Sequence, residues 1–241
     1  MTPVISTDSD GIDAAERRLP LSRELIIAAA AAFVDAHGLP ALTMRGLGKE
    51  LGVEAMSLYR YVNGREDLLE GIVESMIAEL HLDPATMEPL NGWQAYLQWL
   101  AHGVRRIAQE HPSIFPLIAT RHPAAPWLRP PLRSLRVVED FLSELISRGF
   151  TDESAIAAYR AFSSFLLGHL LLEAAARTAE SDIIVDSLGH AEMSASSDEA
   201  SVADFRQVFR LGTRLSEDHS DAEFEASLEN MLDRLDRTLT H

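Results

Sequence analysis

Hydrophobic and polar positions follow a helical period along most of this chain of 241 residues. Apolar residues recur three and four positions apart, a spacing that places them on one face of a helix. The pattern predicts helices over 21–37, 43–51, 54–62, 65–82, 93–110, 129–148, 152–179, 202–215 and 221–238. No β-branched alternating run of useful length occurs, and no internal repeat is found. The fold class expected from the sequence is therefore all-α.

Breaks in this pattern divide the chain. Residues 1–20 are polar and acidic, with breaking prolines and a glycine, and are expected to be a disordered extension. Residues 21–65 hold short helices, for which Ser22 and Thr43 are the expected N-caps. Residues 66–241 carry larger apolar side chains and longer helices. Within them, 181–200 is rich in Ser and Asp and is expected to be a mobile loop.

The segment 42–69 is the most informative part of the sequence. Its pattern predicts two short helices joined by a tight turn at Gly52-Val53, with a further helix immediately after. Leu47 with Leu51, and Leu58 with Val62, can lock the first two helices together. The outer face of the second helix is aromatic, polar and cationic, which suits the edge of a DNA major groove. This face carries Met56, Ser57, Tyr59, Arg60 and Tyr61.

Each candidate in this segment has an expected role on DNA. Thr43 at a helix N-terminus is suited to a phosphate, and Arg45 adds a charge beside it. Arg60 is suited to a guanine. The second helix begins with Ala55, Met56 and Ser57, at the end of a recognition helix that meets base edges. Contacts with the DNA backbone are expected from Tyr59, Tyr61 and Arg65.

Three of these assignments have structural alternatives. Tyr59 can pack against the first helix, and Arg60 can be a solvated surface arginine. Arg65 can cap a helix or pair with Asp67. Gly46 and Gly48 also lie inside the first short helix, where each costs up to ~1 kcal/mol relative to alanine. Gly48 has a packing reason, a close approach of the next helix. Gly46 has no reason in the sequence except a close approach to a phosphate, so Gly46→Ala is expected to raise thermal stability.

Charge is distributed unevenly. The formal net charge of -16 argues against nonspecific binding to polyanions. Residues 45–65, however, carry a net charge of +2, whereas 178–200 and 216–241 are strongly acidic. A mildly basic end on an acidic body would contact phosphates locally and be repelled elsewhere.

Other features of the sequence limit the cellular location of the protein and the chemistry that it can carry out. The chain has no cysteine, and its N-terminus lacks a secretory pattern. The longest apolar runs, 26–34 and 165–172, are shorter than the ~18 residues that span a bilayer. A cytoplasmic protein without a membrane partner is expected. No histidine pair has helical spacing, and neither nucleotide-loop nor nucleophile-elbow spacing is present. An enzyme, a metal site and a cofactor are therefore not expected.

Residues 43–69 resemble the helix-turn-helix of the TetR family of bacterial transcription regulators. The resemblance lies in Leu42-Thr43, Leu47, Leu51-Gly52-Val53, Leu58-Tyr59, Tyr61-Val62, Arg65-Glu66 and Leu68-Leu69, with Ala29-Ala30, Phe33 and Gly38 before them. It implies a homodimer that represses genes from a double-stranded DNA operator and is released by a small-molecule effector. Residues 21–65 would then bind DNA, and residues 66–241 would bind the ligand and form the dimer.

A dimer of this kind needs an interface in its C-terminal half. The expected interface is a four-helix bundle built from two helices of each subunit. Its candidates are Ile156, Tyr159, Phe162, Leu166, Leu170, Phe224, Leu228, Met231 and Leu235. The alternative is that both apolar stripes are buried inside one chain.

The effector pocket is expected between the middle helices. Its candidates are His81, Trp99, Leu100, Val104, Ile118, Leu135, Phe165 and His169. His81 matches a drug-contacting histidine of the tetracycline-repressor subgroup. Leu100 and Ile118 stand where that subgroup has polar and metal-binding residues, so the ligand is expected to be larger and more apolar than a tetracycline–magnesium chelate. A helical protein-interaction module that does not bind DNA remains an alternative function.

Overall fold

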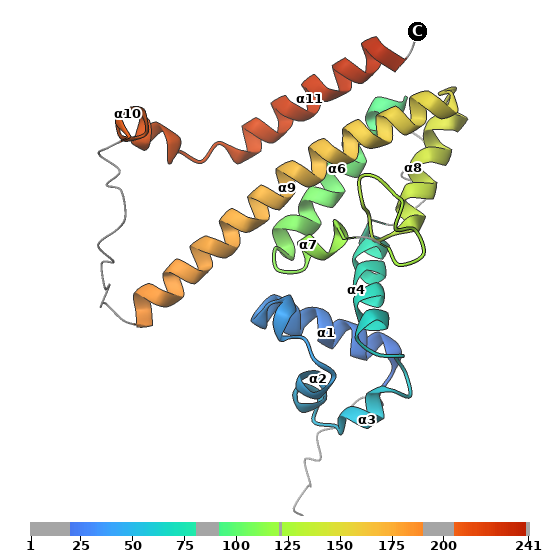
Figure 1. Ribbon diagram of the computed structural model, residues 1–241, viewed down its shortest axis with the longest axis vertical. Helices are drawn as coiled ribbons and strands as arrows, with labels where there is room; N and C mark the ends of the chain where they lie inside the picture. The colour runs from blue at the N-terminus through green and yellow to red at the C-terminus, as the bar shows by residue number, and fades with distance from the viewer. Residues whose placement is uncertain (1–19, 81–91, 121, 190–204, 240–241) are drawn as a thin grey trace, which may run out of the picture.

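The structure, a computed structural model, describes residues 20–80, 92–120, 122–189 and 205–239. These residues form helices and turns without any strand, which confirms the all-α prediction. The first helices are α1 (Arg23–His37), the short 3-10 helix η1 (Leu39–Ala41), α2 (Met44–Leu51) and α3 (Ala55–Leu58). They form one end of the molecule, and α4 (Arg65–Glu79) rises from them into the rest (Figure 1).

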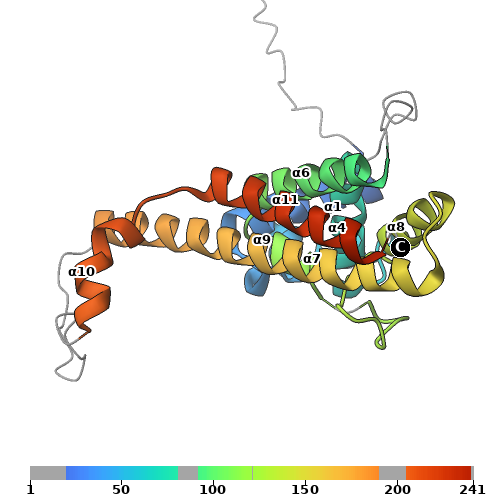
Figure 2. The same ribbon diagram turned by 90° about the horizontal axis from the view of Figure 1, so that it is seen from above.

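The other end is built around one long helix, α9 (Asp152–Gly189). Helices α6 (Trp93–Glu110), α7 (Phe115–Ile118), α8 (Leu135–Ser147) and α11 (Ser220–Leu239) all contact it. Helix α10 (Arg206–Leu215) buries none of its residues and lies beyond one end of this bundle (Figure 2).

The predicted caps are confirmed. The Ser22 side chain accepts a hydrogen bond from the Leu25 N–H at 3.2 Å, and Thr43 Oγ1 accepts one from the Gly46 N–H at 3.0 Å. Such side chains satisfy N–H groups that have no partner inside the helix. Gly38 ends α1 at φ 77°, a left-handed conformation that favours glycine.

The observed bounds differ from the predicted ones for α3 and for α8. Helix α3 ends at Leu58, because the Arg60 and Tyr61 N–H groups bond three residues back, to Ser57 and Leu58, in place of the α-helical pattern. The predicted helix 129–148 begins only at Leu135, since Pro130 and Pro131 supply no N–H and disfavour a helical residue before them.

Helix α9 is longer than predicted. The expected loop at 181–200 is wrong over 181–189, where the helix continues through Gly189, and 190–200 lies outside the described residues. The expected disorder of residues 1–19 and the candidate His81 also lie outside them. Between Asp152 and Arg177, α9 is long and apolar enough to cross a membrane by length and composition alone. Its buried apolar side chains pack in the core, which explains this composition.

Helix α4 connects the two ends of the molecule by close contacts. A Cβ at Gly71 would lie 2.5 Å from Ile27 Cδ1 of α1, so glycine permits this close approach. At the other end of α4, Leu80 Cδ2 would lie 2.7 Å from a Cβ at Gly103 of α6. Because these contacts are close, a movement of α4 is expected to displace both α1 and α6.

Candidate DNA-reading surface and effector cavity

Helices α2 and α3 are held together by a tight turn. Gly52 ends α2 in the left-handed conformation at φ 65°, and the Val53 N–H bonds the Gly48 carbonyl at 2.9 Å. A Cβ at Gly48 would lie 3.0 Å from the Val53 carbonyl oxygen and 3.2 Å from the backbone of Ala55. Gly48 thus allows the backbones to meet, the packing reason expected from the sequence. Leu47 and Leu58 are fully buried beneath this turn.

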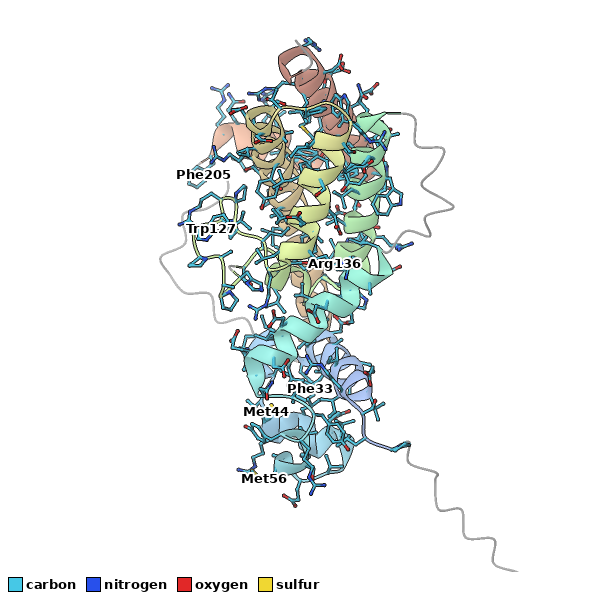
Figure 3. All side chains as sticks on the ribbon, turned by 90° about the vertical axis from the view of Figure 1, so that its right-hand side faces the viewer. Phe33, Met44, Met56, Trp127, Arg136 and Phe205 are labelled. Carbon is cyan, nitrogen blue, oxygen red and sulfur yellow. The ribbon has the colours of Figure 1, made fainter. Side chains whose placement is uncertain are left out.

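The predicted DNA-reading residues lie on the outer surface at this end. Met56 is 75% exposed and Tyr59 is 48% exposed, so Tyr59 is not buried against α1. Met56 lies at the tip of the molecule (Figure 3). Ala55 and Ser57 at the start of α3 are half-buried, and the exposed candidates are Thr43, Arg45, Arg60, Tyr61 and Arg65.

Arg65 has partners within the chain. Its Nε donates to the Leu42 carbonyl at 3.2 Å and its Nη2 donates to the Leu39 carbonyl at 3.3 Å. Asp67, the alternative partner considered from the sequence, bonds Arg23 instead, at 2.6 and 3.0 Å. Arg65 therefore links the start of α4 to the segment before α2. Its side chain is nevertheless exposed, next to the other predicted DNA-reading residues.

Arg23 and Asp67 join α1, α4 and the end of the α3 segment. Arg23 also donates to the Tyr61 carbonyl at 3.2 Å, and Asp67 accepts from the Asn63 N–H at 2.7 Å. These hydrogen bonds, those from Arg23 first, hold the pKa of Asp67 below its ordinary value. The network positions the backbone just after α3, the helix that carries several of the predicted DNA-reading residues. Sequence analysis missed it because its partners are 44 residues apart.

An apolar cavity of about 50 Å³ lies among α4, α6, α8 and α9. Leu100, Val104 and Ile118 line it, as the sequence predicted. Trp99 lines an adjoining cavity of about 250 Å³, and Leu135 lines a separate cleft against α4. Phe165 and His169 do not line the apolar cavity. They pack beside Phe224, with ring centroids at 6.4 and 5.3 Å.

The predicted dimer stripe faces the inside of the chain. Tyr159, Phe162 and Leu166 line the apolar cavity, and the Tyr159 hydroxyl donates to the Pro130 carbonyl at 3.0 Å. Burial raises the pKa of this phenol. Most of these candidates are buried within the chain, and contact with a partner stays a prediction; the buried members are Tyr159, Phe162, Leu166, Leu170, Phe224, Leu228 and Leu235. Ile156 is exposed and Met231 is half-buried.

An ion pair buried between α6 and α9, with an exposed third partner on α11, joins the helices of the bundle. Arg105 of α6 donates to Glu173 of α9 at 3.1 and 3.2 Å and to Asp221 of α11 at 2.7 Å. Its guanidinium carbon lies 4.5 Å from the centre of the Phe224 ring, a cation–π contact. Burial alone would raise the pKa of Glu173, but hydrogen bonds from Arg105 and Gln109 outweigh it and lower the pKa.

Two family models match the chain. The model of bacterial regulatory proteins of the tetR family matches residues 26–72, and the model of the tetracyclin repressor-like C-terminal domain matches residues 85–239. The class E tetracycline repressor protein of Escherichia coli is 29% identical over 166 residues, which is 69% of this chain and 75% of that protein. The repressor DrrR1 of Streptomyces coeruleorubidus is 29% identical over 61% of this chain, and the match spans only 52% of DrrR1.

Solved structures also resemble this chain over most of its length. ActR of Streptomyces coelicolor, a TetR family protein solved in complex with actinorhodin, is 25% identical, with a TM-score of 0.62 over 90% of this chain and 95% of ActR. TetR of Acinetobacter baumannii AYE has the same fold at 23% identity, with a TM-score of 0.61 over 90% of this chain and 97% of that one. Regulators of this family are transcription factors and not enzymes. The chain belongs to the TetR family of DNA-binding transcription regulators, whose members are typically homodimeric and ligand-responsive.

Proposed function

We propose that the chain is a cytoplasmic homodimeric repressor that binds a palindromic operator and is released from it by an apolar small molecule. The observation that carries the proposal is the exposed set around α3, with Met56, Tyr59 and Arg60 free of burial at the tip of the molecule. Base edges in the major groove are read by side chains presented in this way. The loss of such a set would be expected in a module that no longer binds DNA.

The effector is proposed to enlarge the apolar cavity. A drug-sized ligand needs ~300–1,000 Å³, which exceeds the about 50 Å³ found here. Ile77 of α4 lines this cavity and the adjoining one that contains Trp99. A ligand that joins the two would displace α4 and favour a dimer state with a different spacing of its DNA-reading ends. That ActR was solved in complex with actinorhodin supports a small-molecule effector for this chain.

The partner subunit is proposed to meet the outward face of α9. This exposed side of α9 carries small residues, Gly168 among them, and Ile156 and Leu172, which are 43% and 75% exposed, lie at its two edges. A Cβ at Gly168 would meet nothing within 4 Å, so its small size has no use inside the chain and would allow a second helix to approach. Exposed apolar side chains of α10, among them Phe209, extend the surface that a partner would cover.

DNA binding is tested with the DNA upstream of the chain's own gene in a fluorescence anisotropy titration at low salt. The wild type is expected to bind one palindromic fragment, and Arg60→Ala to weaken that binding by ~1–3 kcal/mol, or ~5- to 150-fold. Arg237→Ala, which removes an exposed arginine from α11 far from α3, serves as the matched control. If no fragment binds at low salt, the protein-interaction module is the correct function.

Dimerisation is tested separately by sedimentation. Gly168→Trp should convert the dimer to a monomer because the indole would occupy the space of the partner helix. Ser143→Trp is the control, since it adds the same indole at an exposed helical position on α8, away from the proposed interface. A Gly168→Trp dimer of unchanged affinity would place the partner elsewhere.

A further inference from the structure

A cleft of about 580 Å³ separates α4 from the start of α8. It differs from the apolar cavity in having several charged side chains in its lining, although Ile77 borders both. Arg136 lies where α8 approaches α4 (Figure 3). The wall from α8 and the preceding turn is cationic or polar, with His122, Arg133, Ser134 and Arg136. The α4 wall carries Glu70 and Glu74.

Arg133 is a buried cation whose guanidinium is only partly hydrogen-bonded. The residue is only 6% exposed, and its Nε donates to no acceptor among the described residues. One terminal nitrogen donates to Glu66 at 2.9 Å, and the other has a long contact of 3.4 Å with Thr120 Oγ1. A guanidinium has more N–H groups than these bonds use, and a buried charge is costly unless it is paired.

The acceptor that Arg133 does have is easily displaced. The Glu66 side chain is 70% exposed, so solvent competes for it and weakens the pair. Beside Arg133, α8 begins at Leu135, and the dipole of this helix favours a negative charge there, although the Ser134 hydroxyl already accepts from the Val137 N–H at 3.4 Å. Glu70 is already engaged by His122 at 3.2 Å. An anion that enters from the α8 side would therefore find donors that are not fully used.

We propose that this cleft binds the carboxylate of an amphipathic effector, and that the carboxylate competes with Glu66 for Arg133. The apolar part of the same molecule would lie against Ile77, at the border with the apolar cavity. Glu70 and Glu74 repel an anion held in this position, so its binding pushes α4 away from the start of α8. The regulatory consequence rests on the proposed function, whereas the binding itself does not.

Arg133 also links the effector cavity to the DNA-reading end. Its backbone N–H donates to the carbonyl of Ile118, which lines the apolar cavity, at 3.0 Å. Its partner Glu66 is adjacent to Asp67, which holds Arg23 of α1 at 2.6 Å. Arg23 in turn bonds the Tyr61 carbonyl just after α3. Release of Glu66 would therefore disturb the first turn of α4. This turn holds the backbone after α3 in place through Asp67 and Arg23.

The test is calorimetric titration of the full chain with octanoate, decanoate and dodecanoate, each beside the alcohol of the same length, and with acetate alone. The carboxylates are expected to bind at least tenfold more tightly than the matched alcohols. Acetate, which lacks the apolar part, should not bind measurably. Equal affinity for carboxylates and alcohols would overturn the proposal.

Variants identify the residue. Arg133→Met should abolish the preference for the carboxylate, and Arg133→Lys should retain part of it. Glu66→Gln should tighten carboxylate binding several-fold, because it removes the charged competitor; a purely structural Arg133–Glu66 pair would not produce this gain. Arg129→Met is the control, since this exposed arginine lies on the same segment and donates only to nearby carbonyls among the described residues.

Each possible failure has a separate meaning. If Arg133→Met does not fold, as judged by circular dichroism, the Glu66→Gln result decides, and an unchanged affinity in that variant overturns the proposal. A chain that binds operator DNA but shows no carboxylate preference refutes this inference and leaves the repressor function intact. A chain that prefers the carboxylate but binds no DNA refutes the repressor function instead.

Discussion

The two ends of the molecule each rely on an arginine–carboxylate pair between helices, but the pairs lie in different environments. At the DNA-reading end, Arg23 and Asp67 have side chains that are 37% and 18% exposed. At the effector end, Arg105 and Glu173 are 9% and 8% exposed. The first pair joins α1 to α4 near the surface, and the second joins α6 to α9 inside the bundle.

This difference follows from what each end must do. A DNA-reading surface has to keep its polar groups in water until they meet the groove, so its supporting pairs lie near solvent as well. A cavity between helices needs walls that keep their positions when it is nearly empty, and a buried, fully bonded pair specifies such positions. The energetic consequences of breaking the two pairs should therefore differ, and mutations can test the comparison.

The largest effect is expected from Glu173→Gln. This change leaves the buried Arg105 with Asp221 as its remaining carboxylate partner, and the Asp221 side chain is 88% exposed. Removing one partner from a buried ion pair costs ~3–5 kcal/mol. Urea unfolding at a fixed protein concentration measures it. Glu225→Gln is the control, since Glu225 pairs with His102 at the surface and should change stability little. Equal losses in both variants would remove the contrast between buried and exposed pairs.

The next effect belongs to the DNA-reading end, where packing and not charge is decisive. Gly48→Ala places a Cβ 3.0 Å from the Val53 carbonyl oxygen, and backbone atoms cannot move aside as a side chain can. Overpacking of this kind costs ~1–3 kcal/mol. Operator affinity should fall as well, because α3 would shift relative to α2. A variant with unchanged unfolding and unchanged DNA binding would show that the turn is more adaptable than its distances indicate.

Much of the DNA-reading end could be predicted from the sequence because its contacts are local. The apolar pairs that lock α2 to α3, the cap at Thr43 and the exposed face with Met56 all follow from spacings within a few helical turns. The early end of α3 was missed, since the change to bonds three residues apart leaves no clear mark in the sequence. The Arg23–Asp67 pair was missed because only the folded chain brings its members together.

The effector end was less predictable because the sequence shows a stripe but not what faces it. The periodicity of α9 correctly grouped Tyr159, Phe162 and Leu166 on one side, but it did not show that this side faces a cavity within the chain. The open alternative, burial within one chain, is the one found for these side chains. Arg133 was not a candidate, since its burial depends on the fold of a proline-containing turn that had been predicted to be helical.

A smaller, pH-dependent effect is expected from Asp67→Asn. Hydrogen bonds from Arg23, followed by the Asn63 N–H, lower the pKa of Asp67 below its ordinary value of 3.8. A depressed folded-state pKa contributes stability that is present above the unfolded value and is lost as the pH falls through the folded value. Because the pair is partly exposed, the variant should lose ~1 kcal/mol or less at neutral pH.

Urea unfolding of the wild type and Asp67→Asn from neutral pH downward measures this dependence. The two stabilities should begin to converge as the pH falls below about 4, and should meet only below the lowered folded-state pKa of Asp67. Glu153→Gln, an exposed carboxyl in the first turn of α9, controls for the loss of a negative charge at a helix N-terminus. A constant difference at every pH would show that Asp67 stabilises α4 by its shape and not by its charge.

The smallest effect is expected from Gly46→Ala, which sharpens the comparison within one helix. From helix propensity alone, alanine should gain up to ~1 kcal/mol over glycine. The structure adds an opposing term, because the new Cβ would lie 3.0 Å from Thr43 Oγ1, the atom that caps α2, and 3.5 Å from Phe33 Cζ. A hydroxyl and a ring edge can move by a few tenths of an ångström, so the two effects should nearly cancel and the melting temperature should change little. A rise in melting temperature with unchanged DNA affinity would mean that the cap adjusts freely. A loss as large as that of Gly48→Ala would mean that this end of the molecule is as tightly packed beside its cap as it is at its turn.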